Sequence, residues 1–321
     1  MDQDYKYMVS TKCFTFNHAL YIEDALRGFA IQQTSFPINT VVVDDASTDG
    51  EPDILCHWAA ENLELTVDGT AERETDDARI IEAKLKGNQN HTFVIILLRE
   101  NHHSRKRPKQ RYMAEWVNAA KYHALCEGDD YWIDPQKLQK QVEFMEKHPG
   151  HSLCFCSFKK LFPTGETRII KRYGDNLEEC PMEDIILGGG GYMATNSMMY
   201  RRNMYVSYTS WAIGCPISDG PITLTLASVG LVGYLTDVMC VYRVSAVGSW
   251  SSSMSSNAES RRIHHLAMVK MWHQFDEFSK GKYHKTIRKK LVRNQIGYIH
   301  YELLLFWNRI RKKYTPVQSH S

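Results

Sequence analysis

The feature of the chain that most constrains its fold is the β-branched run Thr40-Val-Val-Val43, which ends in the acidic turn 44–50. An apolar run without alternation is typical of a central strand in a parallel sheet that helices cover on both faces. Further strands are expected at 7–14, 93–98 and 122–126, and helices at 22–30, 54–60, 109–120 and 134–148. This alternation of strands and helices predicts an α/β fold with a parallel, doubly wound sheet.

Two segments depart from this alternation. Residues 64–91 are polar and rich in acids, and we expect them to form a surface excursion with a helix of its own. Residues 153–250 combine strand-like runs with the glycine run Gly188-Gly-Gly-Gly191, and no internal repeat is visible.

Composition excludes several classes of protein. Of the 321 residues, 43% are hydrophobic and 24% are charged, which is ordinary for a globular chain and excludes a disordered, collagen-like or coiled-coil protein. The apolar stretches are far shorter than the ~20 residues of a membrane-spanning helix. Residues 1–10 carry acids where a signal peptide carries cations, so we expect a cytoplasmic protein whose eight cysteines are reduced thiols.

The net charge of +2 conceals an uneven distribution of charge. Residues 261–321 carry 14 Lys and Arg against 3 Asp and Glu, whereas residues 1–260 carry 25 against 34. We therefore expect a domain over 1–255 and a basic helical extension over 256–321. Apolar and aromatic residues at helical spacing in the extension fit two roles: packing against the acidic domain, or peripheral contact with an anionic membrane surface.

Two acidic turns, 44–50 and 127–130, directly follow predicted strands. In open α/β sheets, ligands bind beyond the carboxyl ends of the strands, and carboxylates there suit Mg²⁺ held together with substrate phosphates. Each turn also has a structural interpretation, the first as a helix cap and the second as a solvated turn. A calcium loop that starts at Asp45 is excluded because its twelfth position is Cys56 rather than glutamate.

Other polar residues give weaker signals. The adjacent pairs His102-His103 and His264-His265 are expected on the surface, because neighbours on regular structure cannot both face one site. The basic stretch Arg105-Lys-Arg107 is too short to predict a nucleic-acid partner.

Four segments, in order, resemble a family 2 glycosyltransferase of the GT-A fold, of the inverting, bacterial surface-polysaccharide type. They are VSTKCFTFNHALYIEDAL, VVVDDASTDG, ALCEGDDYWIDPQKLQKQVEFM and SDGPITLTLASVGLVGYLTDVMCVYR. The resemblance implies a Rossmann-like, mostly parallel central sheet, with a nucleotide-binding half over 1–130 and an acceptor-side half over 131–255. It also implies transfer of a hexosyl or N-acetylhexosaminyl group from a nucleotide sugar, usually a UDP-sugar, to a hydroxyl of a saccharide or lipid-linked acceptor.

The resemblance further implies roles in the nucleotide-sugar pocket. Phe14 and Phe16 match positions that line the base, and Asp45 matches the carboxylate that accepts a hydrogen bond from the base, usually uracil. Arg111 is another candidate for the donor pocket. Trp250 belongs to the matching segment 248–251, which is expected to close over the diphosphate.

The chemistry of transfer is implied to depend on three acids. Asp130 matches the ligand of the metal ion, Mg²⁺ or Mn²⁺, and Asp129 matches a position near the ribose or the donor sugar. Asp219 matches the general base that takes the proton of the acceptor hydroxyl, and its structural alternative is a helix cap. The chain departs from the family pattern at Ser218, where a second acid is common, and at Ser245-Ala246, where a histidine near the diphosphate is common.

Two other functions compete with sugar transfer. A sugar-nucleotide pyrophosphorylase shares the nucleotide-binding sheet, but it needs a glycine-rich loop with an arginine after the first strand, and residues 13–21 contain neither. A catalytically inactive homologue that serves as an assembly subunit has no need of Asp45, Asp130 and Asp219, which this chain retains.

Overall fold

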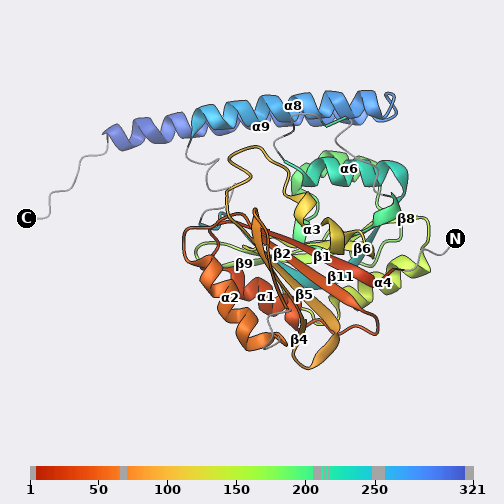
Figure 1. The fold of residues 1–321 in the computed structure, drawn as a ribbon. Helices are drawn as coiled ribbons and strands as arrows, with labels where there is room; N and C mark the ends of the chain where they lie inside the picture. Colours follow the sequence, from red (N-terminus) through yellow and green to blue (C-terminus); the bar gives the residue numbers. More distant parts are fainter. Residues whose placement is uncertain are drawn as a thin grey trace, which may run out of the picture.

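A twisted central sheet lies between two layers of helices in the computed structural model, which describes residues 5–65, 71–204, 211, 212, 215, 217–247 and 257–314 (Figure 1). The strands are β1 (Tyr7–Thr15), β2 (Ile38–Asp44), β3 (Glu72–Glu74), β4 (Ala78–Leu85), β5 (Asn88–Leu98), β6 (Ala120–Leu125), β7 (Tyr131–Trp132), β8 (His151–Leu161), β9 (Thr167–Ile170), β10 (Met198–Arg201) and β11 (Leu231–Arg243). The helices are α1 (Ile22–Ala30), α2 (Glu51–Asn62), α3 (Gln110–Val117), α4 (Lys137–Lys147), α5 (Met182–Gly188), α6 (Asp219–Val229), α8 (Ala258–Phe278) and α9 (His284–Tyr314). Short 3₁₀ turns are η1 (Gly189–Gly191), η2 (Thr195–Ser197) and η3 (Arg202–Met204).

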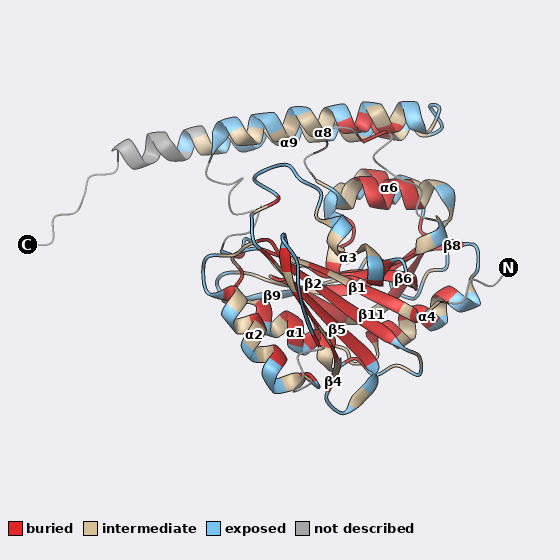
Figure 2. Cartoon of the chain, viewed as in Figure 1, coloured by how far each residue is buried: buried red, intermediate tan, exposed pale blue. Residues whose placement is uncertain are grey.

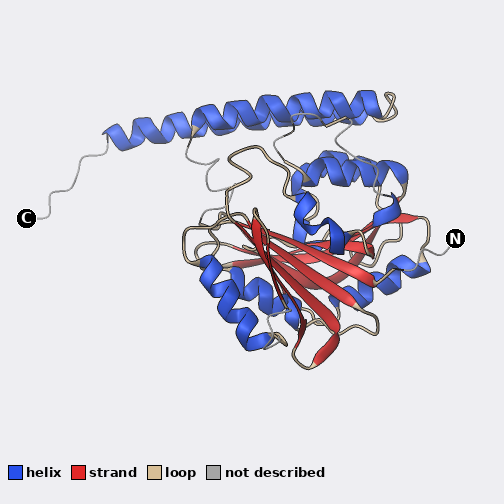
Figure 3. Cartoon of the chain, in the orientation of Figure 1, coloured by secondary structure: helices blue, strands red, loops and turns tan. Residues whose placement is uncertain are grey.

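The sheet is parallel at its centre and antiparallel toward its edges. The strands form one sheet (Figure 3), with the order β3-β4-β5-β2-β1-β6-β10-β8-β11-β7 and with β9 paired to β8. The four neighbours β5, β2, β1 and β6 run parallel, and so do β8 and β11. All seven residues of β2 are buried, as the β-branched run predicts for a strand covered on both faces.

Three apolar clusters hold the layers together. Helices α1, α2 and α4 pack on one face of the sheet, where the largest cluster lies. Helix α3 covers the other face over β2, β4 and β5, and α5 and α6 cover it over β8, β10 and β11.

The helix expected within 64–91 is wrong for the residues that the structure describes. The segment instead holds β3, β4 and the start of β5, which form antiparallel ladders at the sheet edge. In β4 the buried residues Ala78 and Ile80 face the cluster under α3, whereas the buried residues Ile81, Ala83 and Leu85 face the cluster under α1 and α2. Because successive side chains point to opposite faces, the buried face of β4 changes between Ile80 and Ile81.

Asn17 precedes helix α1 but does not cap it, since Tyr21 occupies the N-cap position. Helix α1 begins at Ile22, and Asn17 lies in a left-handed turn with φ of 56°. Its side-chain oxygen accepts a hydrogen bond from Thr48 N at 2.9 Å. Asn17 therefore ties the loop after β1 to the loop after β2, next to the acidic turn.

The basic extension forms a long helical hairpin of α8 and α9 (Figure 1). Met271, Trp272, Phe275 and Ile287 are buried in the cluster that α6 also joins, so the near part of the hairpin packs against the domain. The far part of α9 exposes Val292, Ile296, Ile299, Leu303 and Trp307 (Figure 2). The near part of the hairpin thus has the packing role expected from the sequence, and the far part leaves an apolar surface exposed. None of the described helices has a window long and apolar enough to cross a bilayer.

Helix α1 approaches the backbone of β7 closely because residue 28 is glycine. A Cβ atom on Gly28 would lie 2.7 Å from both the N and the O atom of Trp132. Real Cβ atoms do not tolerate such contacts with backbone, so α1 or β7 would have to shift. β7 directly follows the acidic turn 127–130, and this contact therefore also positions that turn.

We expect Gly28→Ala to lower the free energy of unfolding by about 1–3 kcal/mol, through overpacking against Trp132. Helix propensity alone would favour alanine by about 1 kcal/mol, so the two effects have opposite signs. Urea unfolding followed by tryptophan fluorescence measures the difference. Gly174→Ala is the control, since a Cβ there meets nothing within 4 Å. A Gly28→Ala variant as stable as the wild type would contradict the close packing of α1 on β7.

Candidate active site

Three loops meet at the carboxyl ends of β1, β2 and β6. The parallel register pairs Thr15 with Asp44, and Lys12 with Leu125, so the three strands end at nearly the same level. Backbone hydrogen bonds continue past the strand ends, from Asp45 N to Thr15 O at 3.0 Å and from Gly128 N to Phe14 O at 3.1 Å. Both acidic turns therefore lie beside the end of β1.

The Asp45 carboxylate is fully buried and accepts hydrogen bonds from the loop that precedes α3. Its Oδ1 accepts from His102 N at 2.7 Å, and its Oδ2 accepts from His103 N at 3.0 Å and from Lys109 Nζ at 3.0 Å. The Lys109 amine also lies over the ring of Phe14, 5.3 Å from its centre. Asp45 is not a helix cap, because α2 begins six residues later with Gly50 at its N-cap. Its carboxylate fixes the loop 101–109 over the end of β2.

The Asp129-Asp130 turn is clamped by Arg243 at the end of β11. Arg243 N donates to Asp130 Oδ1 at 2.8 Å, and the guanidinium donates to Asp129 O at 2.7 Å and pairs with Asp24. Asp130 is buried, and burial together with the charge of Asp129 raises the pKa of its carboxyl well above the usual range. The turn is thus a fixed part of the structure rather than a solvated loop.

Trp132, two residues after this turn, points into the core rather than toward the turn. Its side chain is 2% exposed, lies in the core against Phe29, and donates from Nε1 to Asn196 O at 2.8 Å. The indole instead fastens the segment after the acidic turn to the second half of the chain.

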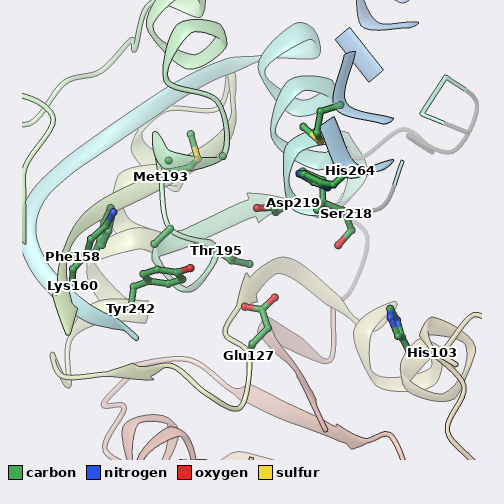
Figure 4. A pocket seen from close by; sticks show the side chains of 15 residues that line it. His103, Glu127, Phe158, Lys160, Met193, Thr195, Ser218, Asp219, Tyr242 and His264 are labelled. Atoms are coloured by element: carbon green, nitrogen blue, oxygen red, sulfur yellow. The ribbon is translucent and has the colours of Figure 1, made fainter. Parts of the chain in front are cut away.

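A cavity of about 590 Å³ opens between the acidic turn and the N-terminus of α6 (Figure 4). The carboxyls of Glu127 and Asp219 point into it from two sides, and Tyr242, His103 and His264 also line it. A second cavity of about 640 Å³ shares Glu127, Thr195, Ser218 and Asp219 with the first; its other lining residues include Lys12, Phe14 and Arg111. The two cavities adjoin at the four residues that they share, and together they are called the cleft below.

The structure brings some of the predicted site residues together and not others. Phe14, Arg111 and Asp219 line the cleft, with the exposed Arg111 side chain also paired to Asp77 at 3.2 Å. Asp45 and Asp130 lie beneath it, in the two loops that shape it. Phe16 is 37% exposed and lines neither cavity. Trp250 and the segment 248–251 lie outside the described residues.

Asp219 is the first residue of α6, and Ser218 occupies the N-cap position. Asp219 is therefore not the N-cap residue of α6. As a carboxylate in the first turn it still interacts favourably with the helix dipole. Burial raises the pKa of the Asp219 carboxyl above its usual value. A half-buried carboxylate with a raised pKa accepts a proton more readily than an exposed one.

Two residues that line the cleft, Glu127 and Lys12, were given no individual role in the sequence analysis. Burial, then the charges of Asp129 and Asp219, raises the pKa of Glu127 to about 8. Burial lowers the pKa of Lys12 to about 8, and its amine hydrogen-bonds the hydroxyl of Tyr200. Glu127 belonged to the acidic run that the sequence singled out, but a lone lysine within β1 gave no signal.

The expectation that both histidine pairs lie on the surface is wrong for His102, whereas His103 is exposed and His264 and His265 are half-buried. His102 is buried, with Nδ1 2.7 Å from Glu100 O and Nε2 2.9 Å from Tyr112 Oη, and its neighbour His103 faces the cleft. His264 also lines the cleft, from α8. The pair 102–103 lies in an irregular loop held by Asp45, where neighbouring side chains can point to one cavity and to the core.

Oxygen ligands for a divalent cation are present at the acidic turn. Adjacent carboxylates at Asp129 and Asp130 are hard donors of the kind that Mg²⁺ and Mn²⁺ prefer, and their mutual repulsion would be relieved by a cation. No group of three or more His, Cys, Asp or Glu side chains among the described residues is arranged to hold a metal ion. A cation at this turn would therefore take the rest of its ligands from a bound phosphate and from water.

No protein-family model matches the chain. Uncharacterized proteins of Mycobacterium bovis and Mycobacterium tuberculosis are 30% identical to it over 252 residues, which is 76% of this chain and 61% of theirs. The chain thus spans about 61% of the length of these relatives.

Solved structures of similar fold include S. aureus TarS. Residues 1–349 of TarS in complex with UDP-GlcNAc give a TM-score of 0.55 at 16% identity, over 83% of this chain and 66% of that chain. Their complex with UDP gives 0.51 at 15% identity, over 89% and 88%. The mannosyltransferase PcManGT from Pyrobaculum calidifontis, in complex with GDP-Man and Mn²⁺, gives 0.48 at 16% identity, over 97% and 82%. The likeness to TarS confirms the expected α/β GT-A fold, to which the α8–α9 hairpin is the C-terminal helical extension.

Proposed function

We propose that the chain is an inverting family 2 glycosyltransferase that transfers a sugar from a UDP-sugar to a hydroxyl of a saccharide or lipid-linked acceptor in bacterial surface-polysaccharide synthesis. The observation that carries this proposal is the cleft in which Glu127 and Asp219 face each other above the Asp129-Asp130 turn. A fold shared with TarS, solved with UDP-GlcNAc and with UDP, supports a nucleotide sugar as the donor.

The nucleotide is proposed to bind over the ends of β1 and β2. Phe14, near the end of β1, is half-buried at the cleft wall and is proposed to offer its ring to the base, with the exposed Phe16 just after the strand. Asp45 is proposed to contact the base through Oδ2, the oxygen that Lys109 now shares with His103 N. A uracil N–H would take the place of the Lys109 amine there. Arg111, at the edge of the cleft, would face the donor.

The diphosphate is proposed to lie over the Asp129-Asp130 turn, with Asp130 as the protein ligand of Mg²⁺ or Mn²⁺ and Asp129 beside the ribose or the donor sugar. When bound, the ion neutralises the negative charge that develops on the departing diphosphate. Arg243 fixes both acids by its hydrogen bonds to Asp130 Oδ1 and Asp129 O. The turn is therefore preorganised, so that little free energy is lost in ordering it when the donor binds.

Asp219 is proposed to be the general base. The acceptor oxygen attacks the anomeric carbon as the bond from that carbon to the diphosphate oxygen breaks, and the hydroxyl proton passes to the Asp219 carboxylate. A single displacement inverts the anomeric centre and needs no covalent intermediate. The raised pKa of Asp219 supports this role, because it makes the carboxylate a stronger base at the start of the step.

The far part of α9 is proposed to contact an anionic membrane surface. Val292, Ile296, Ile299, Leu303 and Trp307 follow one another at intervals of three or four residues and are exposed. Such a stripe lies on one face of the helix, and the basic residues of α9 flank it in sequence. Aromatic and aliphatic residues together with cations suit the headgroup layer of an anionic bilayer.

Asp130→Ala should abolish the metal-dependent part of UDP affinity, because it removes the proposed ligand while the backbone clamp of Arg243 on Asp129 O persists. Calorimetric titration of UDP with and without Mn²⁺ measures this part. Glu61→Ala, which removes an exposed acid at the end of α2 that lines neither cavity, is the control and should keep the metal-dependent part of the affinity. If Mn²⁺ increases the UDP affinity of the wild type and of Asp130→Ala by the same factor, Asp130 is not the metal ligand.

Asp219→Asn should bind the UDP-sugar almost normally but lose roughly 10²–10⁴-fold in kcat, since the amide cannot accept the proton. Turnover is followed as UDP released, after a screen of UDP-glucose, UDP-galactose and their N-acetyl analogues has identified the donor and an acceptor. Ser228→Ala, near the C-terminal end of α6 and outside both cavities, should stay within a few-fold of the wild type. If Asp219→Asn keeps wild-type turnover, Asp219 is not the general base and has only a structural role at the start of α6.

The protein should co-sediment with vesicles of phosphatidylglycerol and phosphatidylcholine at low salt, and less at high salt, where its cations are screened. Ile299→Asp with Leu303→Asp should weaken this binding, because the pair places charge in the exposed apolar stripe. Val229→Asp, at an exposed position of α6, is the matched control. Absence of sedimentation with anionic vesicles at low salt would leave the hairpin only its packing role.

A further inference from the structure

A second opening leads away from the proposed catalytic cleft toward the helical hairpin. A cavity of about 510 Å³ lies between the glycine run 188–191 and helices α8 and α9. It shares Gly190, Gly191, His264 and Met268 with the cleft that holds Glu127 and Asp219. A ligand that reaches Asp219 can therefore extend past His264 into this cavity.

The lining of this cavity is basic and contains no acid. Its charged and titratable residues are Arg261, His264, His265, Lys290 and Arg293. Arg261 pairs with Glu302 at 2.8 Å, so its charge already has a partner. Within the described part of the chain, no carboxylate lies in ion-pair distance of Lys290 or Arg293. Two cations three residues apart on one helix face therefore lack a counter-charge from the protein.

Lys290 is held in place rather than free in solvent. It is half-buried, and its amine donates to Leu187 O at 2.9 Å. Burial, and then the charge of Arg293, lowers the pKa of Lys290. A surface lysine that only serves solubility would not be kept half-buried beside another cation. An anion in the cavity would neutralise both side chains and accept further hydrogen bonds from them.

The glycine run keeps the cavity open. Gly190 and Gly191 have nothing within 4 Å of a Cβ position, so side chains there would enter the open space. Gly189 has φ of 58°, and a Cβ on it would lie 2.7 Å from Lys290 Nζ. Glycine at these positions therefore allows Lys290 to approach the run and leaves exposed backbone along the cavity.

We propose that this cavity binds a phosphate group of the acceptor, so that the acceptor of the transfer is a phosphate-bearing saccharide or lipid. The inference rests on the proposed function, because it extends the acceptor side of the same cleft. An Arg guanidinium and a Lys ammonium together suit a phosphate, the first as a fork of N–H donors and the second as a point charge. The donor diphosphate belongs to the Asp129-Asp130 turn and leaves this cavity unused.

The test measures binding of two phosphate compounds to the full chain without divalent cations, in EDTA. Glucose 1-phosphate represents a phosphosugar, dodecyl phosphate below its micelle concentration represents a lipid phosphate, and methyl α-glucoside is the neutral control. Lys290→Gln with Arg293→Gln should weaken phosphate binding at least 10-fold. Arg288→Gln with Lys289→Gln removes the same charge from the exposed face of α9 and should leave it unchanged.

The single variant Arg293→Gln, which retains the Lys290 contact to Leu187 O, should show part of the loss. UDP–Mn²⁺ affinity reports separately on the donor site and should be the same in all these variants. Binding of either phosphate compound that depends on Lys290 and Arg293 supports the proposal, and their order of affinity identifies the source of the phosphate.

Two results would overturn the inference: no phosphate binding by the wild type, or equal weakening by the two double variants. If UDP–Mn²⁺ fails to bind while phosphate binding depends on Lys290 and Arg293, the proposed function fails and the anion site remains. If UDP–Mn²⁺ binds and phosphate does not, only the inference fails.

Discussion

In-register parallel pairing of β1 with β2 and β6 is the constraint on which the rest of the site depends. Parallel strands must be joined by crossover connections, to which α1, α2 and α3 belong here. Each of the parallel strands therefore starts at one end of the sheet and finishes at the other. The loops after β1, β2 and β6 are thereby forced together at one edge of the sheet. Asp45 and Asp130 are far apart in the sequence, but this pairing places both of them beside the end of β1.

The second half of the chain supplies what closes the site. β11 delivers Arg243 to the Asp129-Asp130 turn, and α6 presents Asp219 from above. Burial, and then like charges, raise the pKa of Glu127 and of Asp130. Keeping these carboxyls ionised in the folded state therefore costs free energy. Sites that hold such a cost commonly bind something that relieves it, and a metal-bound diphosphate is the ligand of that kind that the proposed chemistry requires.

The sequence predicted the features that follow from local periodicity and missed those that depend on long-range contact. The buried run 40–43 and the amphipathic helices fixed the parallel centre of the sheet. The hairpin within 64–91 was missed because the segment is acidic and the buried face of β4 changes between Ile80 and Ile81, which leaves no sustained alternation. Lys12 gave no signal and His103 was expected only on the surface, since their place in the cleft is set by the pairing of β1 and by the hydrogen bonds of Asp45.

A crystal structure of the protein with UDP and Mn²⁺, with anomalous data at the manganese edge, tests the central claim most directly. The account predicts a single strong anomalous peak in coordination distance of Asp130 and of a diphosphate oxygen, with the uracil ring beside Phe14. Well-ordered UDP bound away from the ends of β1, β2 and β6, or a manganese peak remote from the 127–130 turn, would contradict it.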